Sequence, residues 1–485
     1  MIKTRIRNNW GVCVCYNKKL ILETHFEMKR TKKLFWLGLP ILIILVMWLK
    51  WDNWFYNPPE PPYTPSTTPD RILLSWSGDP LNSRDVTWQG DTLTRTGFLQ
   101  ITNNSTPGDT IQYTSPSKII KTSGGASSFF RVGMKNLKEG ETYLYRVANG
   151  SHWSDWYNFK IANRTDSAYS FIYIGDVQDS INGVTGKLFH RAYESQPNAA
   201  FIMFIGDMIE RPHDAYWGEW FKAGGTLFRT IPVIATPGNH EYHKGLIQKL
   251  DERWMAHFSF PQNGPPNFLG RVCYWDYQNT RYISMDSNGI QSIPSAFEQR
   301  NWLKSVLENT HQRWIVLMMH HPIYSTSRGR DYFYLRALFK PLIDQYNVDL
   351  VLVGHDHAYG RAAHIQNSKF KDKQGAIYIG THASPKWYDT GFSEKMDKLA
   401  TNTEMYQLLD VSNDSIRFRA YTADSTYFDG FTIHKDAAGN RRLTENAPKN
   451  SSEFLKPTKY FLRKNSKGDL EKYEQQMKDW ERSKN

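Results

Sequence analysis

The sequence predicts an α/β domain, made of a sheet covered by helices, that follows a smaller all-β domain. From residue 168 to about 365, short apolar runs alternate with segments of helical spacing, which is typical of a parallel or mixed sheet. From 70 to 162 the chain holds short strand-like runs separated by turn residues, which is typical of a small sandwich. A third observation bears on function: five apolar runs of the α/β part end in carboxylate, amide or imidazole residues.

The chain begins with a basic leader, residues 1–33, and continues with an uncharged apolar run that ends at Leu49. A charged segment before an apolar segment is typical of a signal sequence, and no small-residue cleavage site follows this one. We therefore expect residues 34–51 to be an uncleaved signal anchor that leaves the folded part exported, on the periplasmic or extracellular face of a membrane. The alternative is a protein that is secreted after signal cleavage. Met28 directly precedes the basic cluster and is a candidate for the true start.

A stretch with six prolines, residues 52–69, links the anchor to the folded part. Prolines at this density favour an extended, semi-rigid spacer. The formal net charge of +12 arises at the two ends of the chain, because residues 34–434 hold equal numbers of acidic and basic side chains. A nucleic-acid-binding protein needs a basic surface on its folded part, so we expect no nucleic-acid partner. The three cysteines are too few for a disulfide framework, and Cys273 is expected to be a small buried residue.

Residues 70–162 are expected to form a sandwich of the fibronectin type III kind. The predicted strands are 72–76, 85–88, 97–101, 129–134, 143–148 and 156–161. No cluster of metal-ligand residues occurs in this part of the sequence. We therefore expect this domain to be structural or to form a wall of a cleft.

Residues 168–434 are expected to form the α/β domain. Helical spacing predicts helices over 188–194, 300–307 and 334–346, and four further strands are predicted at 376–380, 405–411, 416–420 and 430–433. These late strands are expected to complete a second sheet. The basic tail, 435–485, holds an amphipathic helix over 469–484 that either docks on the body or stays loose.

The five apolar runs that end in metal-ligand residues are followed by Gly175-Asp176, Gly206-Asp207, Gly238-Asn239-His240-Glu241, His320-His321-Pro322 and Gly354-His355-Asp356-His357. In α/β sheets, ligands bind beyond the carboxyl ends of the strands. We therefore expect these side chains to meet on one rim of the sheet. Carboxylate, amide and imidazole ligands together suit a pair of divalent or trivalent metal ions.

These segments, in this order, resemble the motifs of the calcineurin-like metallophosphoesterases, and more narrowly those of the purple acid phosphatase-like branch. That branch carries a fibronectin-like N-terminal domain, and the phrase from Pro69 to Trp76 resembles the start of that domain. The resemblance covers residues 70 to 434 and leaves out the leader and the tail.

The resemblance implies an exported, metal-dependent phosphohydrolase that cleaves phosphomonoesters by attack of a hydroxide bound to two metal ions. The ions would be iron, zinc or manganese, and the partner a phosphate ester. Two alternatives stay open at this point. One is a phosphodiesterase with the same dimetal core, and the other is a non-catalytic exported scaffold that keeps a structural metal site.

Carried over residue by residue, the resemblance implies two adjacent metal sites joined by Asp207. The first would be held by Asp176 and His357, and the second by Asn239, His320 and His355. His240 would face the phosphate, where it stabilises developing charge or protonates the leaving group; the alternative is that it orients its neighbours. Glu241 is expected to fix His240 by a hydrogen bond.

The sequence departs from the family pattern at two positions. The purple enzymes carry a tyrosinate ligand three residues after the second Asp, where this chain has Glu210. Gln178 stands two residues after Asp176, where related enzymes often have a His ligand, and it either binds the first metal or contacts the substrate. Tyr359 and Arg361 follow the last motif and either line the pocket or pack in the core.

Overall fold

The computed structural model describes residues 3–7, 13–17, 39–42, 44–106, 108–363, 375–449 and 453–484. In the N-terminal unit, β1 (Lys3–Arg7) pairs antiparallel with β2 (Cys13–Asn17), residues 39–42 and 44–49 are helical, and α2 spans Trp51–Trp54. Within the described ranges, no helix is both long enough and apolar enough to cross a bilayer. Met28, most of the leader and part of the predicted anchor lie outside the described residues. The anchor therefore stays a prediction.

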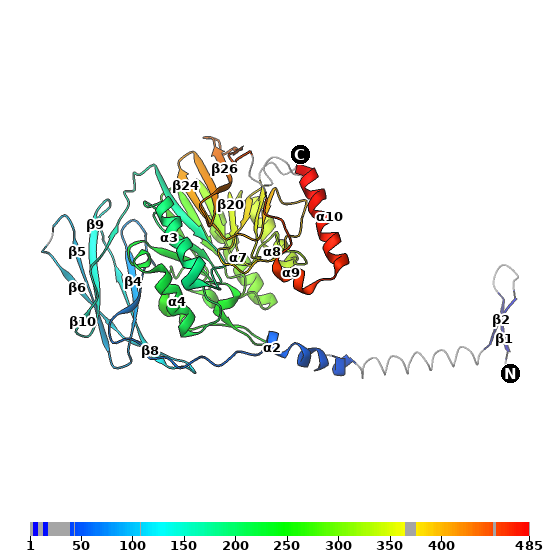
Figure 1. Cartoon of the computed structure of the whole chain (residues 1–485), viewed down its shortest axis with the longest axis horizontal. Helices are drawn as coiled ribbons and strands as arrows, with labels where there is room; N and C mark the ends of the chain where they lie inside the picture. The colour runs from blue at the N-terminus through cyan, green and yellow to red at the C-terminus, as the bar shows by residue number, and fades with distance from the viewer. Residues whose placement is uncertain are drawn as a thin grey trace. The chain divides into compact units, whose positions relative to one another are not determined.

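The N-terminal β domain consists of two sheets that face each other (Figure 1). One sheet has the order β3-β4-β8-β7, with β3 at Asp70–Ser75, β4 at Arg84–Gly90, β7 at Lys118–Lys121 and β8 at Ala126–Met134. The other has the order β10-β9-β5-β6 with β11 beside β9, and its strands span Thr96–Asn103 (β5), Ile111–Pro116 (β6), Thr142–Asn149 (β9), His152–Trp153 (β10) and Tyr157–Lys160 (β11). Apolar side chains from both sheets, among them Trp88, Phe130 and Tyr145, fill the space between them. The sandwich architecture is present, and its assignment to the fibronectin type III kind stays a prediction.

The first sheet of the α/β domain has the order β14-β13-β12-β24-β25-β26-β27. Its parallel part comprises β12 (Ala168–Ile174), β13 (Ile202–Ile205) and β14 (Val233–Thr236). The antiparallel part comprises β24 (Met405–Ser412), β25 (Ser415–Thr422), β26 (Tyr427–Lys435) and β27 (Arg441–Glu445). The predicted strands 405–411, 416–420 and 430–433 thus extend the sheet that the first strands of the domain begin, and the prediction that they complete a second sheet is wrong.

The second sheet has the order β17-β18-β19-β20-β22-β21-β23. It begins with the hairpin of β17 (Cys273–Tyr277) and β18 (Thr280–Ser284) and continues with the parallel strands β19 (Trp314–Met318), β20 (Leu350–Val353) and β22 (Ile377–Gly380). The far edge is formed by β21 (Tyr359–Ala363) and β23 (Lys398–Ala400). The prediction that all five motif-bearing strands share one rim is therefore wrong. Three of these strands lie in the first sheet and two in the second, because the chain leaves the first sheet after β14.

Helices cover the outer faces of both sheets (Figure 1). The first sheet packs on α3 (Gly186–Ser195) and α4 (Asp214–Gly224), and the second on α7 (Ile293–Glu308) and α8 (Phe333–Gln345). The tail forms α9 (Lys459–Lys464) and α10 (Lys467–Lys484), and Trp480 of α10 joins the apolar cluster of α7 and α8, so the tail docks on the body. The short elements are the π-turn Ile181–Thr185, the 3₁₀ turns Asn239–Glu241 and Pro266–Phe268, α5 (Leu227–Thr230), α6 (Trp254–His257), β15 (Tyr242–His243) and β16 (Lys249–Leu250). The coarse fold prediction, an α/β domain preceded by a β domain, is confirmed.

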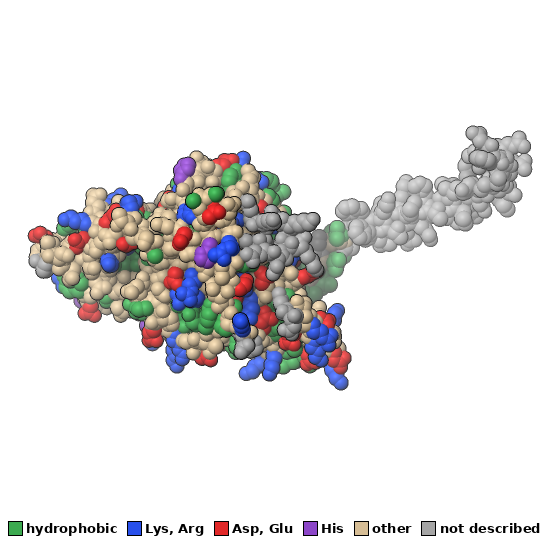
Figure 2. All heavy atoms as spheres, turned by 90° about the horizontal axis from the view of Figure 1, so that it is seen from above, with side chains coloured by type: hydrophobic (Ala, Val, Ile, Leu, Met, Phe, Trp, Pro, Cys, Tyr) green, Lys and Arg blue, Asp and Glu red, His purple; other side chains and the backbone are tan. Residues whose placement is uncertain are grey.

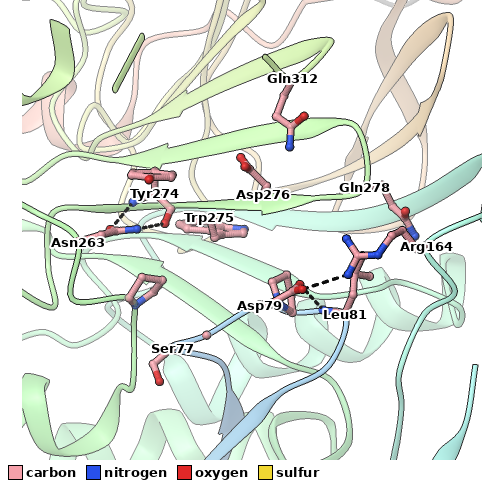
Figure 3. A pocket seen from close by; sticks show the side chains of 13 residues that line it. Ser77, Asp79, Leu81, Arg164, Asn263, Tyr274, Trp275, Asp276, Gln278 and Gln312 are labelled. Atoms are coloured by element: carbon pink, nitrogen blue, oxygen red, sulfur yellow. Dashed lines mark hydrogen bonds and ion pairs between the residues drawn. The ribbon is translucent and has the colours of Figure 1, made fainter. Parts of the chain in front are cut away.

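The β domain is bonded to the α/β domain by buried contacts. Arg71 forms a buried ion pair of 2.6 Å with Asp214 at the start of α4, and the hydroxyl of Tyr145 donates a hydrogen bond of 2.6 Å to the carbonyl of Arg229. A polar pocket of about 440 Å³ lies at the same junction, between the turn around Asp79 and the hairpin β17–β18 (Figure 3). On the face drawn in Figure 2, acidic and basic side chains are interspersed.

Candidate metal centre

The motif residues meet where strands of the two sheets end. Asp176, Asp207 and Asn239 follow β12, β13 and β14 of the first sheet, whereas His320 follows β19 and His355 and His357 follow β20 of the second. Hydrogen bonds join the turns across the two sheets: the amide of His355 donates to Asp176 Oδ2 over 2.6 Å. The two sheets therefore build one centre together.

Two groups of side chains are each able to hold a metal ion, and Asp207 belongs to both. One group is Asp207, His320 and His355, and the other is Asp176, Asp207 and His357; within each group the ligand atoms lie within 4.8 Å of one another. The Nε2 atom of His320 lies 3.2 Å from Asp207 Oδ2 and 3.1 Å from His355 Nδ1. The predicted pair of metal ions is confirmed to this extent, as two groups that share one carboxylate.

Asn239 adds an amide oxygen to the group that contains His320. Its Oδ1 atom lies 3.2 Å from His320 Nε2. The other ring nitrogen of His320 donates to the carbonyl of Ile205 over 2.9 Å, and Nδ1 of His357 donates to the carbonyl of Lys386 over 2.5 Å. Because each ring holds its proton at Nδ1, the lone pair of Nε2 points into the centre, as a metal ligand requires.

Unpartnered oxygen atoms show that the centre suits cations. Asp176 Oδ1 and Gln178 Oε1 are buried without a hydrogen-bond partner among the residues that the structure describes, although buried polar atoms are nearly always paired. Gln178 lies inside the cluster, since its Nε2 atom is 3.0 Å from His357 Nε2 and 3.2 Å from Asp207 Oδ2. Free carboxylate and amide oxygens beside imidazole nitrogens are the donor set of a divalent or trivalent metal.

The backbone at the centre adopts the left-handed region at four of these residues, with φ of 50° at Asp176, 51° at Asp207, 73° at His355 and 47° at His357. Non-glycine residues with such angles are uncommon and cost about 1–3 kcal/mol each. Glycine permits the accompanying close approach: a Cβ atom on Gly354 would lie 2.4 Å from Asp176 Oδ2. The surrounding contacts must therefore hold the ligand backbone in place.

The side chains of the centre perturb one another's protonation. Burial raises the pKa of Asp176 well above its ordinary value, and the Asp207 carboxylate adds to this rise. Burial opposes charge on His320 as well, yet the Asp207 carboxylate raises the pKa of that ring to about 10. The same attraction, first to His320 and then to His240, holds the pKa of Asp207 well below its usual range despite burial. The two buried carboxylates therefore ionise together only with positive charge beside them; His320 supplies it to Asp207, and metal ions would supply it to both.

His240 stands at the exposed side of the centre. Its Nε2 atom lies 3.9 Å from Asp207 Oδ2, and 21% of its side chain is exposed. Its Nδ1 atom donates to the carbonyl of Glu210 over 2.6 Å. The prediction that Glu241 fixes His240 is wrong, because the Glu241 carboxylate is buried and accepts hydrogen bonds from the amides of Asp207, Met208 and Gly238. Glu241 therefore ties together the turns after β13 and β14.

Tyr359 and Arg361 do not line the centre. Both bond the buried Asp429 on β26, at 2.7 Å from the tyrosine hydroxyl and 2.9 Å from the arginine Nε. Of the two predicted roles, the structure therefore gives these residues core packing. The reason is that β21 is a buried strand of the second sheet. Tyr359 and Arg361 are two residues apart on it, so both side chains lie on the same face, where they meet β26 of the first sheet.

Three contacts around the centre were not predicted from the sequence. The carbonyls of Glu210 and Lys386 orient His240 and His357, and Arg330 donates to the carbonyl of His355 over 3.0 Å. A contact made by a backbone carbonyl cannot be predicted from a sequence, because every residue carries one. Arg330 could be found in the sequence, since it is a basic residue in the loop after the motif His320-His321-Pro322.

Sequence profiles of two families match the chain. The profile of the calcineurin-like phosphoesterases matches residues 169–359, and that of the purple acid phosphatase N-terminal domain matches residues 69–161. The first profile contains every residue of the two metal-holding groups. The tail with α9 and α10 lies outside both matches.

Curated relatives are similar over part of the chain. A purple acid phosphatase of Glycine max is 25% identical over 56% of this chain and 60% of its own length. Purple acid phosphatase 15 of Arabidopsis thaliana is 28% identical over 51% of this chain and 52% of its own, and an uncharacterized protein of Mycobacterium tuberculosis is 28% identical over 34% and 35%. The chain thus spans about one third to three fifths of the length of these relatives.

Solved structures show the same fold. A purple acid phosphatase from yellow lupin (Lupinus luteus) superposes with a TM-score of 0.61 at 16% identity, covering 77% of this chain and 75% of that protein. The structure of PhoD superposes with a TM-score of 0.58 at 12% identity, covering 86% and 99%. With both profiles matched in this order, the chain carries a calcineurin-like phosphoesterase domain preceded by a purple acid phosphatase N-terminal domain.

Proposed function

We propose that this protein is a metal-dependent hydrolase that cleaves phosphomonoesters. The observation that carries the proposal is the pair of metal-holding groups with Asp207 in common. Two cations held side by side neutralise the charge of a phosphoryl group and lower the pKa of a bound water. The curated relatives include proteins named purple acid phosphatase, which supports a phosphate ester as substrate.

The chain's own residues divide the work. Asp176, Gln178 and His357 would hold one ion, Asn239, His320 and His355 would hold the other, and Asp207 would contribute to both. His240 is partly exposed beside Asp207 and is the group that meets the phosphate ester. Because Nδ1 of this ring is committed to the Glu210 carbonyl, Nε2 is the atom that stabilises charge or passes a proton to the leaving oxygen.

The metals are proposed to be iron, zinc or manganese. One relative, of Arabidopsis thaliana, is named an Fe(3+)-Zn(2+) purple acid phosphatase, which supports this choice. The mixed oxygen and nitrogen donor set accommodates all three ions.

Hydrolysis assays with p-nitrophenyl phosphate and with its bis ester, with Mn²⁺, Zn²⁺ or Fe added, test the proposal. We expect faster turnover of the monoester, and turnover that a chelator abolishes. A preference for the bis ester would instead identify a phosphodiesterase with the same core. No turnover of either ester by a protein that elemental analysis shows to be metal-loaded would favour a non-catalytic scaffold.

We also propose that the N-terminal segment anchors the protein on the exported side of a membrane. Support comes from the basic cluster before an uncharged run that ends at Leu49, and from Trp48 and Trp51, residues typical of a membrane interface. Alkaline carbonate extraction of membranes that contain the full-length chain tests this. Retention in the membrane pellet is the expected result, and release into the soluble fraction of a chain shortened by signal cleavage would identify a secreted protein.

A further inference from the structure

The C-terminal residues 453–484, named the C-terminal clamp below, pack on two loops that adjoin the metal centre. Phe461 of α9 and Tyr473 of α10 are both buried, and their ring centroids lie 5.0 Å apart. The Tyr473 hydroxyl donates to the carbonyl of Leu455 over 3.0 Å. The two helices of the clamp (red in Figure 1) are thus joined by these side chains and packed as one structure.

The clamp binds loop 386–392 directly. The amide and the hydroxyl of Thr458 donate to the Asp389 carboxylate over 2.8 and 3.2 Å. The hydroxyl of Tyr473 lies 3.2 Å from that of Thr390, and its ring lies 5.1 Å from that of Phe392. Asp389, Thr390 and Phe392 of this loop are therefore in contact with the clamp.

The clamp also covers loop 325–332. The guanidinium of Arg328 lies over the rings of Phe461 and Tyr473, at 5.4 and 5.8 Å from their centroids. The backbone of Arg328 donates to the carbonyl of Asp389 over 2.8 Å, and the amide of Gly391 donates to the carbonyl of Thr326 over 2.8 Å. The two loops are thereby bonded to each other beneath the clamp.

Both loops hold the segment that carries His355 and His357. From loop 386–392, the carbonyl of Lys386 accepts from His357 Nδ1, and the amide of Tyr388 donates to the His357 carbonyl over 3.1 Å. From loop 325–332, the amide of Thr326 donates to the Asp356 carboxylate over 2.6 Å, and Arg330 donates to the His355 carbonyl. His355 and His357 are two of the residues whose backbone is held in the left-handed region.

We propose that the C-terminal clamp is a positioning element for the metal centre: through the two loops it keeps His355 and His357 in the strained backbone conformation that aims their rings at the metals. This inference rests on the proposed metal site. It assigns a role in metal affinity to a segment that lies outside both family matches. Phe461 and Tyr473 are accordingly positioning residues, since neither contacts the ligands directly.

The test measures Mn²⁺ affinity by calorimetry in the full-length protein for wild type, Phe461→Ala, Phe461→Leu and Tyr473→Phe. Phe461→Ala removes the ring over Arg328, and we expect it to weaken Mn²⁺ binding about tenfold or more. Phe461→Leu keeps an apolar side chain there and should restore most of the affinity. Tyr473→Phe loses only the hydroxyl, folds with its ring packing intact, and should weaken binding about two- to fivefold.

Hydrogen–deuterium exchange of the metal-free proteins provides a second readout. In Phe461→Ala, residues 325–332, 355–357 and 386–392 should exchange faster than in wild type. A matched control is Phe159→Ala, a large-to-small change in the core of the β domain, which should lower Tm without changing Mn²⁺ affinity. Gln475→Ala, on the exposed face of α10, should change neither.

The proposal would be overturned if Phe461→Ala and Tyr473→Phe bound Mn²⁺ as tightly as wild type and showed the same hydrogen–deuterium exchange. So would an equal loss of affinity in Phe159→Ala, because the effect would then reflect general destabilisation. A wild-type protein that binds Mn²⁺ but hydrolyses neither p-nitrophenyl ester would count against the proposed function and leave this inference standing.

Discussion

At the scale of single residues, Asp207 has the most demanding role in the centre. It belongs to both metal-holding groups. Its Oδ1 atom also accepts a hydrogen bond of 2.9 Å from the backbone amide of His240. One side chain therefore serves two metal sites and the turn that carries His240. No other described residue belongs to both groups.

Asp207→Asn tests that role with little disturbance of the backbone, because asparagine tolerates the left-handed conformation found there. Loss of the shared charge should release at least one metal ion and lower kcat/KM by roughly 100-fold or more. Elemental analysis and a p-nitrophenyl phosphate assay measure both effects. Asp414→Asn, at an exposed turn, should match wild type. Full activity in Asp207→Asn would contradict the assignment.

Glu210 gives a second prediction at this scale, one of colour. Its carboxylate lies 3.7 Å from Lys386 Nζ, and it stands three residues after Asp207, where the purple enzymes carry their tyrosinate ligand. We therefore expect the iron-loaded protein to lack the visible charge-transfer band that a tyrosinate ligand gives the purple enzymes. An optical spectrum after iron loading decides this, and a purple solution would show that a tyrosine binds the metal.

The residues of the centre were predictable because each follows an apolar run directly, so a local pattern places it at a strand end. The contacts of Tyr359 and Arg361 were not predictable, since their partner Asp429 lies about 70 positions further along the chain. For the same reason Glu241 was assigned to its neighbour in sequence. Its real partners are amides of two turns that only the folded sheet brings together.

At the scale of elements, the turns after β13 and β14 depend on Glu241. Its carboxylate is the common acceptor for the amides of Asp207 and Gly238, and burial, followed by the charge of Asp207, raises its pKa to about 7. Burial and the neighbouring charge thus disfavour the ionised form of Glu241, while the hydrogen bonds from the backbone amides stabilise it. Such an arrangement is expected where backbone geometry matters for function.

Glu241→Ala should therefore leave buried amides unpaired and destabilise the protein by about 2–4 kcal/mol. It should also weaken metal binding, because the turn that carries Asp207 loses its anchor. Urea unfolding and a Mn²⁺ titration measure the two effects. Glu252→Ala, at an exposed position, serves as the control. Unchanged stability and unchanged metal affinity would show that the turns after β13 and β14 keep their conformation without the Glu241 carboxylate.

The elements themselves were largely predictable, whereas their pairing was not. The predicted helices 188–194, 300–307 and 334–346 lie within or overlap α3, α7 and α8. Hydrophobic periodicity is local and appears in the sequence. Which strands share a sheet is decided by contacts between distant segments, such as β12 with β24, over 200 residues later. The division of the motif-bearing strands between two sheets therefore needed the structure.

At the scale of the whole molecule, the β domain is joined to the α/β domain by a buried histidine. The ring of His257 packs against Phe129 of the β domain and against Trp217 and Phe221 of α4. Burial, with the nearby charges of Arg71 and Arg253, holds the pKa of His257 well below its ordinary value. The folded protein thus keeps this ring neutral where the unfolded chain would protonate it.

His257→Phe should make the protein more tolerant of acid. In wild type, the stability tied to the neutral ring is present above pH about 6.5 and is lost as the pH falls, because only the unfolded chain takes up the proton. Between pH 7 and pH 5, wild type should lose about 2 kcal/mol more than His257→Phe. Denaturant unfolding at the two pH values measures this. His152→Asn, at an exposed histidine, should behave as wild type does, and equal losses in all three proteins would contradict the argument.

The edge strand β17 carries a cysteine that can report local opening of the hairpin β17–β18. The thiol of Cys273 on this strand is buried, and burial raises its pKa to about 12. A chain that starts at Met28 would contain this cysteine alone. The thiolate is the form of cysteine that attacks a disulfide reagent. A reagent that releases a coloured thiol would therefore modify the native protein only when the hairpin β17–β18 opens, and the rate of modification would measure the rate of that opening.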